Sequence, residues 1–179
     1  IAPYTRGVSA AGHSIEPWLV AQEIPAGLPS DFNKALREDL NRGQNAVMLL
    51  LDTATRRCAD PETTGGAHVA VCGVSIATLD DLAAALENIS LEAVPLMVWA
   101  GASSVPMAGM LQALASKRGE DLRQWKGAVL ADPLTEAARD GGPQIPFEKA
   151  CKEMAAGVRW AEESAPGFRT VGIQASLWG

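Results

Sequence analysis

The chain of 179 residues is 47% hydrophobic and 20% charged, proportions of a water-soluble globular protein long enough to bury one core. Its net charge of −6 and lack of a basic stripe argue against nucleic acid or an anionic membrane as the main partner. We expect no signal peptide, because no Lys/Arg-led apolar segment follows Ile1, and no membrane span, because no apolar run approaches roughly 18 residues.

The first half of the chain alternates short apolar runs, typical of strands, with amphipathic helical patterns. Strands are predicted over residues 17–24, 46–51 and 69–76. The middle run is aliphatic throughout, which predicts a strand buried on both faces, as in a parallel sheet. Helices are predicted after the first strand and after the third, with Ser30 and Thr78 as their N-caps.

The second half of the chain repeats this alternation. Strands are predicted over residues 95–100, 127–131 and 168–175. Between the first two, a helix that carries Met107 and Met110 on its core side is expected to end at Gly119, directly after two cations. A long helix is predicted over residues 147–164, before the last strand.

The repeated order of strand and helix requires a parallel sheet, in an open doubly wound fold or in a barrel. No Gly-rich phosphate fingerprint follows the first strand, which disfavours the nucleotide-binding doubly wound fold. A complete barrel needs about 250 residues, and this chain offers about five or six strands. We therefore predict an α/β fold of the parallel (β/α)8 TIM-barrel type. It would form one domain over residues 1–179 that is truncated at its C-terminal end.

A polar cluster follows the aliphatic run at residues 46–51, where parallel α/β folds place their binding sites. It consists of Asp52, Thr55, Arg56 and Arg57. Paired arginines can hold phosphate or carboxylate through bidentate hydrogen bonds. The alternative is a structural role, in which Asp52 accepts a hydrogen bond from a basic side chain, with Arg57 the first candidate, or from a backbone donor.

Two adjacent serines, Ser103 and Ser104, lie between a predicted strand and a predicted helix. A nucleophile elbow at this place has the pattern G-x-S-x-G, but Val105 stands where the second glycine belongs. No histidine is placed as a plausible base either. Helix capping is therefore the expected role of these hydroxyl groups.

The three cysteines and two histidines predict neither a disulfide framework nor a metal site. Cys58, Cys72 and Cys151 are odd in number and lack CxxC spacing, so we expect small buried side chains in a reducing cytoplasm. His13 and His68 lack partners at the spacing of metal ligands and are expected in loops.

Several segments, in one order and with consistent spacing, resemble the substrate-binding barrel of the methylmalonyl-CoA mutase family. They are LDTATRRCADPE, GVSIATLDDL, WKGAVLADPLTE and FRTVGIQASLWG, preceded by IAPYTRG and DFNKALREDLNRGQNAVMLLLD, which resemble the entry into the first barrel strand. The resemblance covers nearly the whole chain. It implies a barrel that threads an acyl-CoA along its axis and faces a separate cobalamin domain. The implied activity is adenosylcobalamin-dependent interconversion of methylmalonyl-CoA and succinyl-CoA.

The resemblance also implies that this chain has lost side chains with which the family binds its substrate. A threonine and a glutamine of one family strand correspond to Ala128 and Leu130, and the histidine that contacts the substrate carbonyl corresponds to Leu177. The arginine that holds the substrate carboxylate corresponds to Asp140, and Arg139 lies one position away. Each lost charged hydrogen bond is worth roughly 1.5 to 3 kcal/mol, so losing three or four would abolish useful catalysis.

Other positions are retained in this comparison. Tyr4 matches a tyrosine of the catalytic pocket, and Asp52, Thr55 and Arg57 match the end of the first barrel strand. The family's cobalamin motif D-x-H-x-x-G is absent, because Ala11 and Gly66 stand where aspartate would precede the two histidines. We therefore expect no cofactor, metal or catalytic residue in this chain.

The chain thus resembles the small, non-catalytic subunit of heterodimeric methylmalonyl-CoA mutases. This implies a cytoplasmic isomerase complex in which a homologous catalytic large subunit binds adenosylcobalamin. Two alternatives remain from the residues. One is a catalytically active, divergent acyl-CoA mutase barrel that uses Tyr4, Arg56, Arg57 and Arg139. The other, weaker alternative is an unrelated barrel enzyme that binds a phosphorylated substrate near the same arginines.

Overall fold

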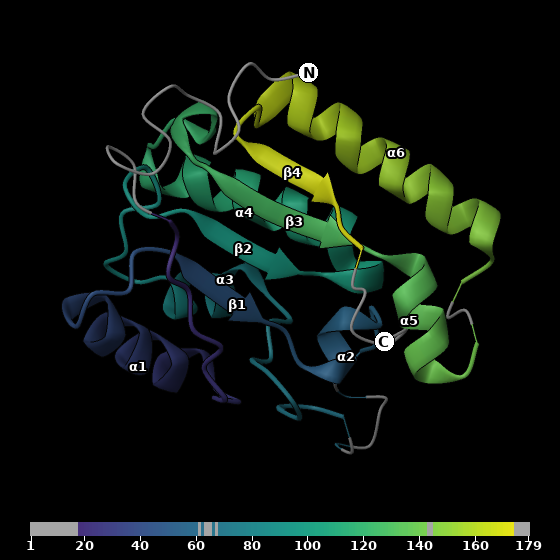
Figure 1. The fold of residues 1–179 in the computed structure, drawn as a ribbon, viewed down its shortest axis with the longest axis horizontal. Helices are drawn as coiled ribbons and strands as arrows, with labels where there is room; N and C mark the ends of the chain where they lie inside the picture. The colour runs from purple at the N-terminus through teal and green to yellow at the C-terminus, as the bar shows by residue number, and fades with distance from the viewer. Residues whose placement is uncertain (1–17, 61, 63–65, 67, 143–144, 174–179) are drawn as a thin grey trace.

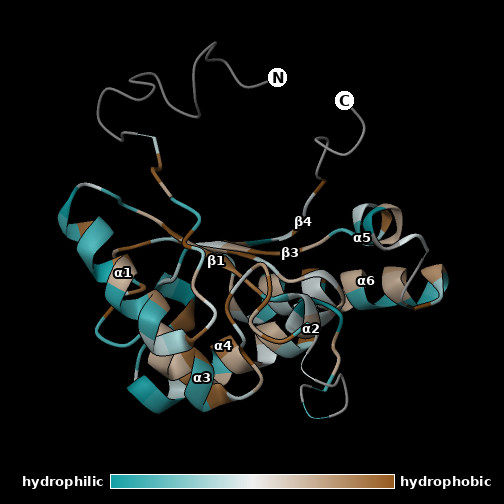
Figure 2. Cartoon of the chain, turned by 90° about the horizontal axis from the view of Figure 1, so that it is seen from below, coloured by the Kyte–Doolittle hydropathy of each residue, from teal (hydrophilic) through white to brown (hydrophobic). Residues whose placement is uncertain are grey.

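A computed structural model of the chain describes residues 18–60, 62, 66, 68–142 and 145–173. The sequence predictions for Tyr4, His13 and Leu177 lie outside these residues, as does the side chain of Asp140. The described residues form a layer of parallel strands with the main helices packed against one of its faces (Figures 1 and 2).

Four strands form the sheet, and they run parallel to one another. They are β1 (Val47–Leu50), β2 (Leu96–Trp99), β3 (Gly127–Ala131) and β4 (Phe168–Val171). Their order in the sheet is β1-β2-β3-β4, so each strand pairs with the next one along the chain. Consecutive parallel strands joined by crossovers of one hand carry their connecting helices on the same face. The prediction of a parallel α/β fold is confirmed.

Four of the helices run along the helix-covered face of the sheet (Figure 2). They are α1 (Pro29–Asn41), α3 (Leu79–Ala85), α4 (Ser104–Arg118) and α6 (Phe147–Ser164). The shorter helical segments are α2 (Thr53–Arg56), η1 (Gly101–Ser103), η2 (Leu122–Gln124) and α5 (Pro133–Asp140).

Helix ends follow local capping chemistry. Thr78 caps α3 in a capping box with Asp81, and α4 ends at Gly119 with φ +67°, so both predictions are confirmed. The prediction of Ser30 as N-cap is wrong. Helix α1 begins two residues earlier than this prediction, with Leu28 as N-cap, because Pro29 takes the first helical position, where its missing N–H is no loss.

Two of the predicted strands, over residues 17–24 and 69–76, are wrong. In the described structure each contributes one isolated bridge, the first from Glu23 to Met48 of β1 and the second from Val74 to Leu51, directly after β1. The second segment cannot extend as a strand because Ala70 and Cys72 have positive φ angles of 57° and 61°.

The strands bury one face under the helices. Val47, Leu49, Val98 and Val129 are fully buried there and form the centre of the core. The other face, which we call the open face, carries Met48, Leu50, Met97, Trp99, Ala128 and Leu130 on the first three strands. The prediction that β1 is buried on both faces does not hold among the described residues. Met48 and Leu50 are only half-buried, because no described layer covers the open face.

Core predictions for α4 hold: Met107 is fully buried, and Met110 packs against the core. The prediction that the cysteines are buried is wrong. Cys58, Cys72 and Cys151 are all exposed: the first two have positive φ angles of 54° and 61° outside the core elements, and the third lies on the outer side of α6.

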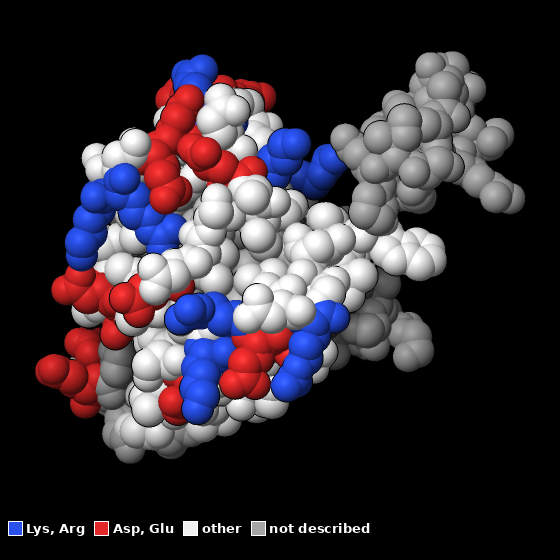
Figure 3. Space-filling model, turned by 90° about the vertical axis from the view of Figure 1, so that its left-hand side faces the viewer, with Lys and Arg blue, Asp and Glu red and all other residues white. Residues whose placement is uncertain are grey.

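Charges of both signs are interspersed on the molecular face that carries α1, and Figure 3 shows no continuous basic area on the described part of that face. Glu38 of α1 and Arg42, the C-cap of that helix, form one such opposite pair, with a nitrogen–oxygen distance of 3.9 Å. No helix among the described residues combines the length and apolar character needed to cross a bilayer.

Candidate functional site

The carboxyl end of β1 passes directly into α2, and Asp52 is the N-cap of that helix. Its two carboxylate oxygens accept hydrogen bonds from the backbone N–H groups of Thr55, at 2.8 Å, and Ala70, at 2.7 Å. The hydroxyl oxygen of Thr55 accepts from the N–H of Ile76 at 3.2 Å. The predicted hydrogen bond to Asp52 is confirmed, with backbone donors in place of Arg57. Asp52 is fully buried, and together Asp52 and Thr55 hold the loop before α3 against the end of β1.

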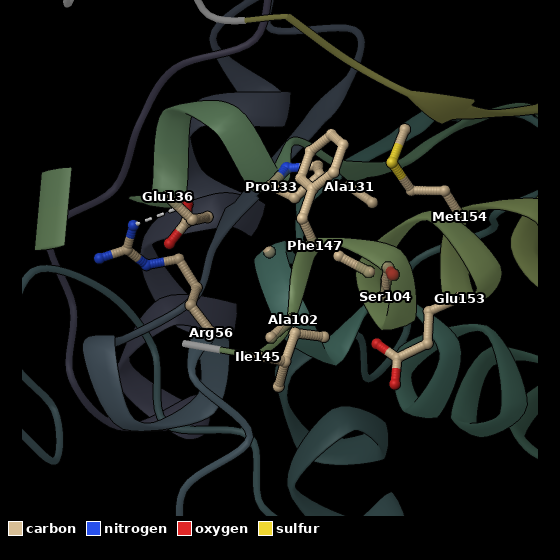
Figure 4. A pocket seen from close by; sticks show the side chains of 12 residues that line it. Arg56, Ala102, Ser104, Ala131, Pro133, Glu136, Ile145, Phe147, Glu153 and Met154 are labelled. Atoms are coloured by element: carbon tan, nitrogen blue, oxygen red, sulfur yellow. Dashed lines mark ion pairs between the residues drawn. The ribbon is translucent and has the colours of Figure 1, made fainter. Parts of the chain in front are cut away.

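Two arginines meet at one carboxylate near the same edge of the sheet. Arg56 belongs to α2, which follows β1, whereas Glu136 and Arg139 belong to α5, which follows β3. The Nη1 atoms of Arg56 and Arg139 lie 3.6 Å and 3.0 Å from the same atom, Oε1 of Glu136. Figure 4 shows the guanidinium of Arg56 turned toward that carboxylate. We call Arg56, Glu136 and Arg139 the arginine–glutamate cluster.

Helix α5 brings Glu136 to this cluster, and the sequence analysis missed that helix. Asp132, buried at the end of β3, is its N-cap and accepts a hydrogen bond from the N–H of Thr135 at 3.1 Å. Pro133 is the first residue of α5. The Asp-Pro pair directly after a strand is the sequence signal that predicts this helix start.

Gly101 permits the close approach of α2 and α5. It lies just after β2 with φ +56°, in the left-handed region. A β-carbon at this position would lie 3.0 Å from the carbonyl oxygen of Arg56 and 3.3 Å from Cδ of Glu136. Glycine after the middle strand therefore leaves room for the residues that follow β1 and β3 to come together at the arginine–glutamate cluster.

A pocket of about 40 Å³ adjoins the cluster. Arg56 and Glu136 form part of its wall, and most of the remainder is apolar, including Ala102, Phe147 and Met154 (Figure 4). A cavity needs at least about 10–15 Å³ to hold one water molecule. The pocket is therefore large enough for a few waters but far too small for an acyl-CoA.

The two serines at the start of α4, Ser103 and Ser104, do not act as predicted. The Ser103 hydroxyl donates to the carbonyl oxygen of Ala100 at 2.8 Å, and no side chain caps the start of α4. Ser104 is buried and lines the pocket. The prediction of side-chain capping is wrong because the turn of η1 directs the first hydroxyl back to the end of β2.

Ala128 and Leu130 both lie on the open face of β3, in register with Met97 and Trp99 of β2. A β-carbon on Gly172 would meet side-chain atoms of Leu130 and Trp99 at 3.0 Å and 3.1 Å, so these large side chains lie together. On the open face of the first three strands, the indole of Trp99 is the only side-chain hydrogen-bond donor.

The structure thus separates the predicted site residues into different settings. Arg56 and Arg139 come together through Glu136, while Asp52 and Thr55 bond to backbone groups of the loop before α3. Arg57 is half-buried at the end of α2. His68 is exposed in a turn, as predicted. Among residues 18–173 as far as the structure describes them, no three His, Cys, Asp or Glu side chains are grouped to hold a metal.

Although the residue Cys58 is exposed, neighbouring atoms shield part of its thiol from water, and this partial desolvation raises the pKa of the thiol above its ordinary value. The nearby carboxylate of Glu153 raises the pKa further, while Lys149 acts in the opposite direction. Less thiolate is present at a given pH, so Cys58 is a poor nucleophile.

We expect Glu153→Gln to speed alkylation of Cys58 by iodoacetamide at pH 8 about two- to threefold, because the negative charge that raises the pKa of the thiol is removed. The rate is measured by peptide mass spectrometry. The exposed Glu162→Gln is the control, and equal rates in both variants would contradict this electrostatic effect.

Residues 1–178 match the family model described as methylmalonyl-CoA mutase. The chain is 24% identical to methylmalonyl-CoA mutases of Escherichia coli and Cereibacter sphaeroides, over 97% of this chain and 24% of each relative. It is 23% identical to the human mitochondrial methylmalonyl-CoA mutase, over 97% of this chain and 23% of that protein. The chain therefore spans about a quarter of the length of these relatives. Because the family model covers nearly all of it, this chain belongs to the methylmalonyl-CoA mutase family.

Proposed function

We propose that the chain belongs to the non-catalytic small subunit of a heterodimeric methylmalonyl-CoA mutase. A homologous catalytic large subunit binds adenosylcobalamin and the acyl-CoA in this complex. The described sheet is then an arc of a (β/α)8 barrel. Sequential strand order and helices on one face support a barrel, since a doubly wound sheet reverses its strand order and carries helices on both faces.

The observation that carries this proposal is the chemistry of β3 on the open face. In a barrel this face lines the interior, along which the family's acyl-CoA would run. Ala128 and Leu130 stand where the resemblance places a threonine and a glutamine that bond the substrate, and neither side chain has a donor. Rearrangement of an acyl-CoA needs a polarised thioester carbonyl and a carboxylate held still by preorganised donors. This strand supplies neither from its side chains.

The described residues do not fit adenosylcobalamin, which in the family supplies the radical that starts the rearrangement. His68 is exposed, and Gly66 stands two positions before it where the cobalamin motif has aspartate. The open face of the first three strands offers a single side-chain donor. We assign the cofactor to the partner subunit and derive no chemical step for this chain.

The alternative of an active, divergent barrel depends on free arginines. Arg56 and Arg139 instead share the carboxylate of Glu136, in an environment where their charges are already compensated. An external substrate carboxylate would have to displace that internal one. This favours a non-catalytic role for the chain over a catalytic one. A cytoplasmic location is also favoured, because reducing conditions suit three exposed free cysteines.

Ligand titrations of the full-length protein test this function. We expect no change in the absorbance of added adenosylcobalamin and no heat of binding with methylmalonyl-CoA, because the aliphatic residues on β3 leave the substrate without its donors. The catalytic large subunit, titrated in the same way, is the positive control. Micromolar affinity of this chain for either ligand would refute the non-catalytic role.

A further inference from the structure

The arginine–glutamate cluster joins groups that are far apart in the sequence and mostly hidden from solvent. The side chains of Arg56, Glu136 and Arg139 are 11%, 15% and 30% exposed. Ion pairs on open surfaces contribute little, because water screens them. Here two positive charges are held close to one another in a partly buried place, so the intervening carboxylate is required for both to be stable there.

Arg56 retains hydrogen-bonding capacity that the cluster does not use. A guanidinium has five N–H donors. The Nε atom of Arg56 is buried and has no acceptor among the described residues, and its Nη2 atom reaches Thr53 Oγ1 only at 3.5 Å. The ion pair to Glu136 is also long, at 3.6 Å. Arg56 therefore has N–H donors available to bind an anion, and it faces the carboxylate of Glu136 from the same chain.

The adjoining pocket provides space beside this carboxylate. Arg56 and Glu136 both line it, and Ala102, Ala131 and Pro133 give it an apolar wall. Substitution of Glu136 by alanine removes one methylene group and the carboxylate, which are the heavy atoms of acetate. The space left would combine an arginine at one end with apolar walls, a setting suited to a short carboxylic acid.

We propose that Arg56 and Arg139 form a binding site for small carboxylates, and that Glu136 occupies this site as an internal ligand. As a tethered group it competes at an effective concentration of about millimolar or more, so external carboxylates are excluded from the unmodified chain. The contact is autoinhibitory in this sense. It goes beyond the subunit role proposed above and does not depend on it, since it concerns a pocket beside the carboxyl ends of β2 and β3 rather than the open face.

Rescue of Glu136→Ala by acetate tests the proposal in the full-length protein. Thermal unfolding is followed by circular dichroism at pH 7 in sodium acetate, and in sodium chloride of the same ionic strength. We expect saturating acetate to raise the Tm of the variant by about 3 °C or more over chloride. Acetamide, which has the same shape without the charge, should give no rise.

Matched variants separate site binding from a general salt effect. Wild type and Glu136→Gln, in which a side chain still fills the space, should show no difference between acetate and chloride. Glu136→Ala combined with Arg56→Met should lose the response. Equal Tm values in acetate and chloride for Glu136→Ala, or an equal rise in Glu136→Gln, would overturn the proposal. If Glu136→Ala does not fold alone, refolding with acetate but not with chloride supports the site, and failure in both overturns it.

Discussion

Replacing Gly127 by alanine is expected to lower the free energy of unfolding by more than about 3 kcal/mol. Gly127 opens β3 with φ +150° and is paired in register with Leu96 of β2. A β-carbon there would overlap the carbonyl oxygen of Leu96, which is backbone and cannot move aside without breaking the β2–β3 pairing. Urea denaturation followed by circular dichroism measures the loss.

Gly119→Ala is the matched control for this substitution. Gly119 also has a positive φ, +67°, but a β-carbon at that position would have no neighbour within 4 Å. Its replacement therefore carries only the backbone penalty, about 1 kcal/mol. A loss of stability in Gly127→Ala no greater than in Gly119→Ala would show that the close approach of β2 and β3 does not restrict this position.

Asp52→Ala is expected to lower the free energy of unfolding by about 2–4 kcal/mol. The carboxylate is fully buried and accepts from the N–H groups of Thr55 and Ala70. Alanine would leave both donors without a partner, one at the start of α2 and one in the loop before α3. Urea denaturation with an unchanged m-value measures the effect on stability alone.

Two further variants separate the contributions at this position. Asp52→Asn keeps one acceptor oxygen but presents an NH2 group to the second donor, so its loss should be intermediate. Asp132→Ala removes the corresponding N-cap of α5, which accepts a hydrogen bond from the N–H of Thr135, and the loss of this cap should cost about 1 kcal/mol. A change of less than a few tenths of a kcal/mol in Asp52→Ala would mean that water replaces the carboxylate.

The sequence predicted the sheet well because its strands are short aliphatic runs, such as residues 95–100 and 127–131. Caps with a local chemical cause, at Thr78 and Gly119, were also predictable. The segment at residues 69–76 was not, because its apolar composition is that of a strand. Its positive φ angles accompany a tertiary contact, the donation of the Ala70 N–H to Asp52, which lies 18 residues away and is not apparent from the local sequence.

The candidate site was predictable in one half only. The polar residues after β1 stand together in the sequence, so Asp52 and Arg56 were recognised at once. Glu136 was missed because residues 133–140 were not recognised as a helix, and because its pairing with Arg56 depends on how the strand ends are arranged in space. Such a contact between the ends of β1 and β3 has no local signature, whereas the Asp-Pro start of α5 does.

The mass of the complex formed with a catalytic large subunit tests the central claim most directly. The full-length protein is co-expressed with that subunit and analysed by size-exclusion chromatography with light scattering. The account predicts a one-to-one heterodimer held by a large, apolar interface of the permanent class. All bound adenosylcobalamin should remain with the large subunit when the two are separated. A full-length protein that stays monomeric in the presence of the large subunit would contradict the claim.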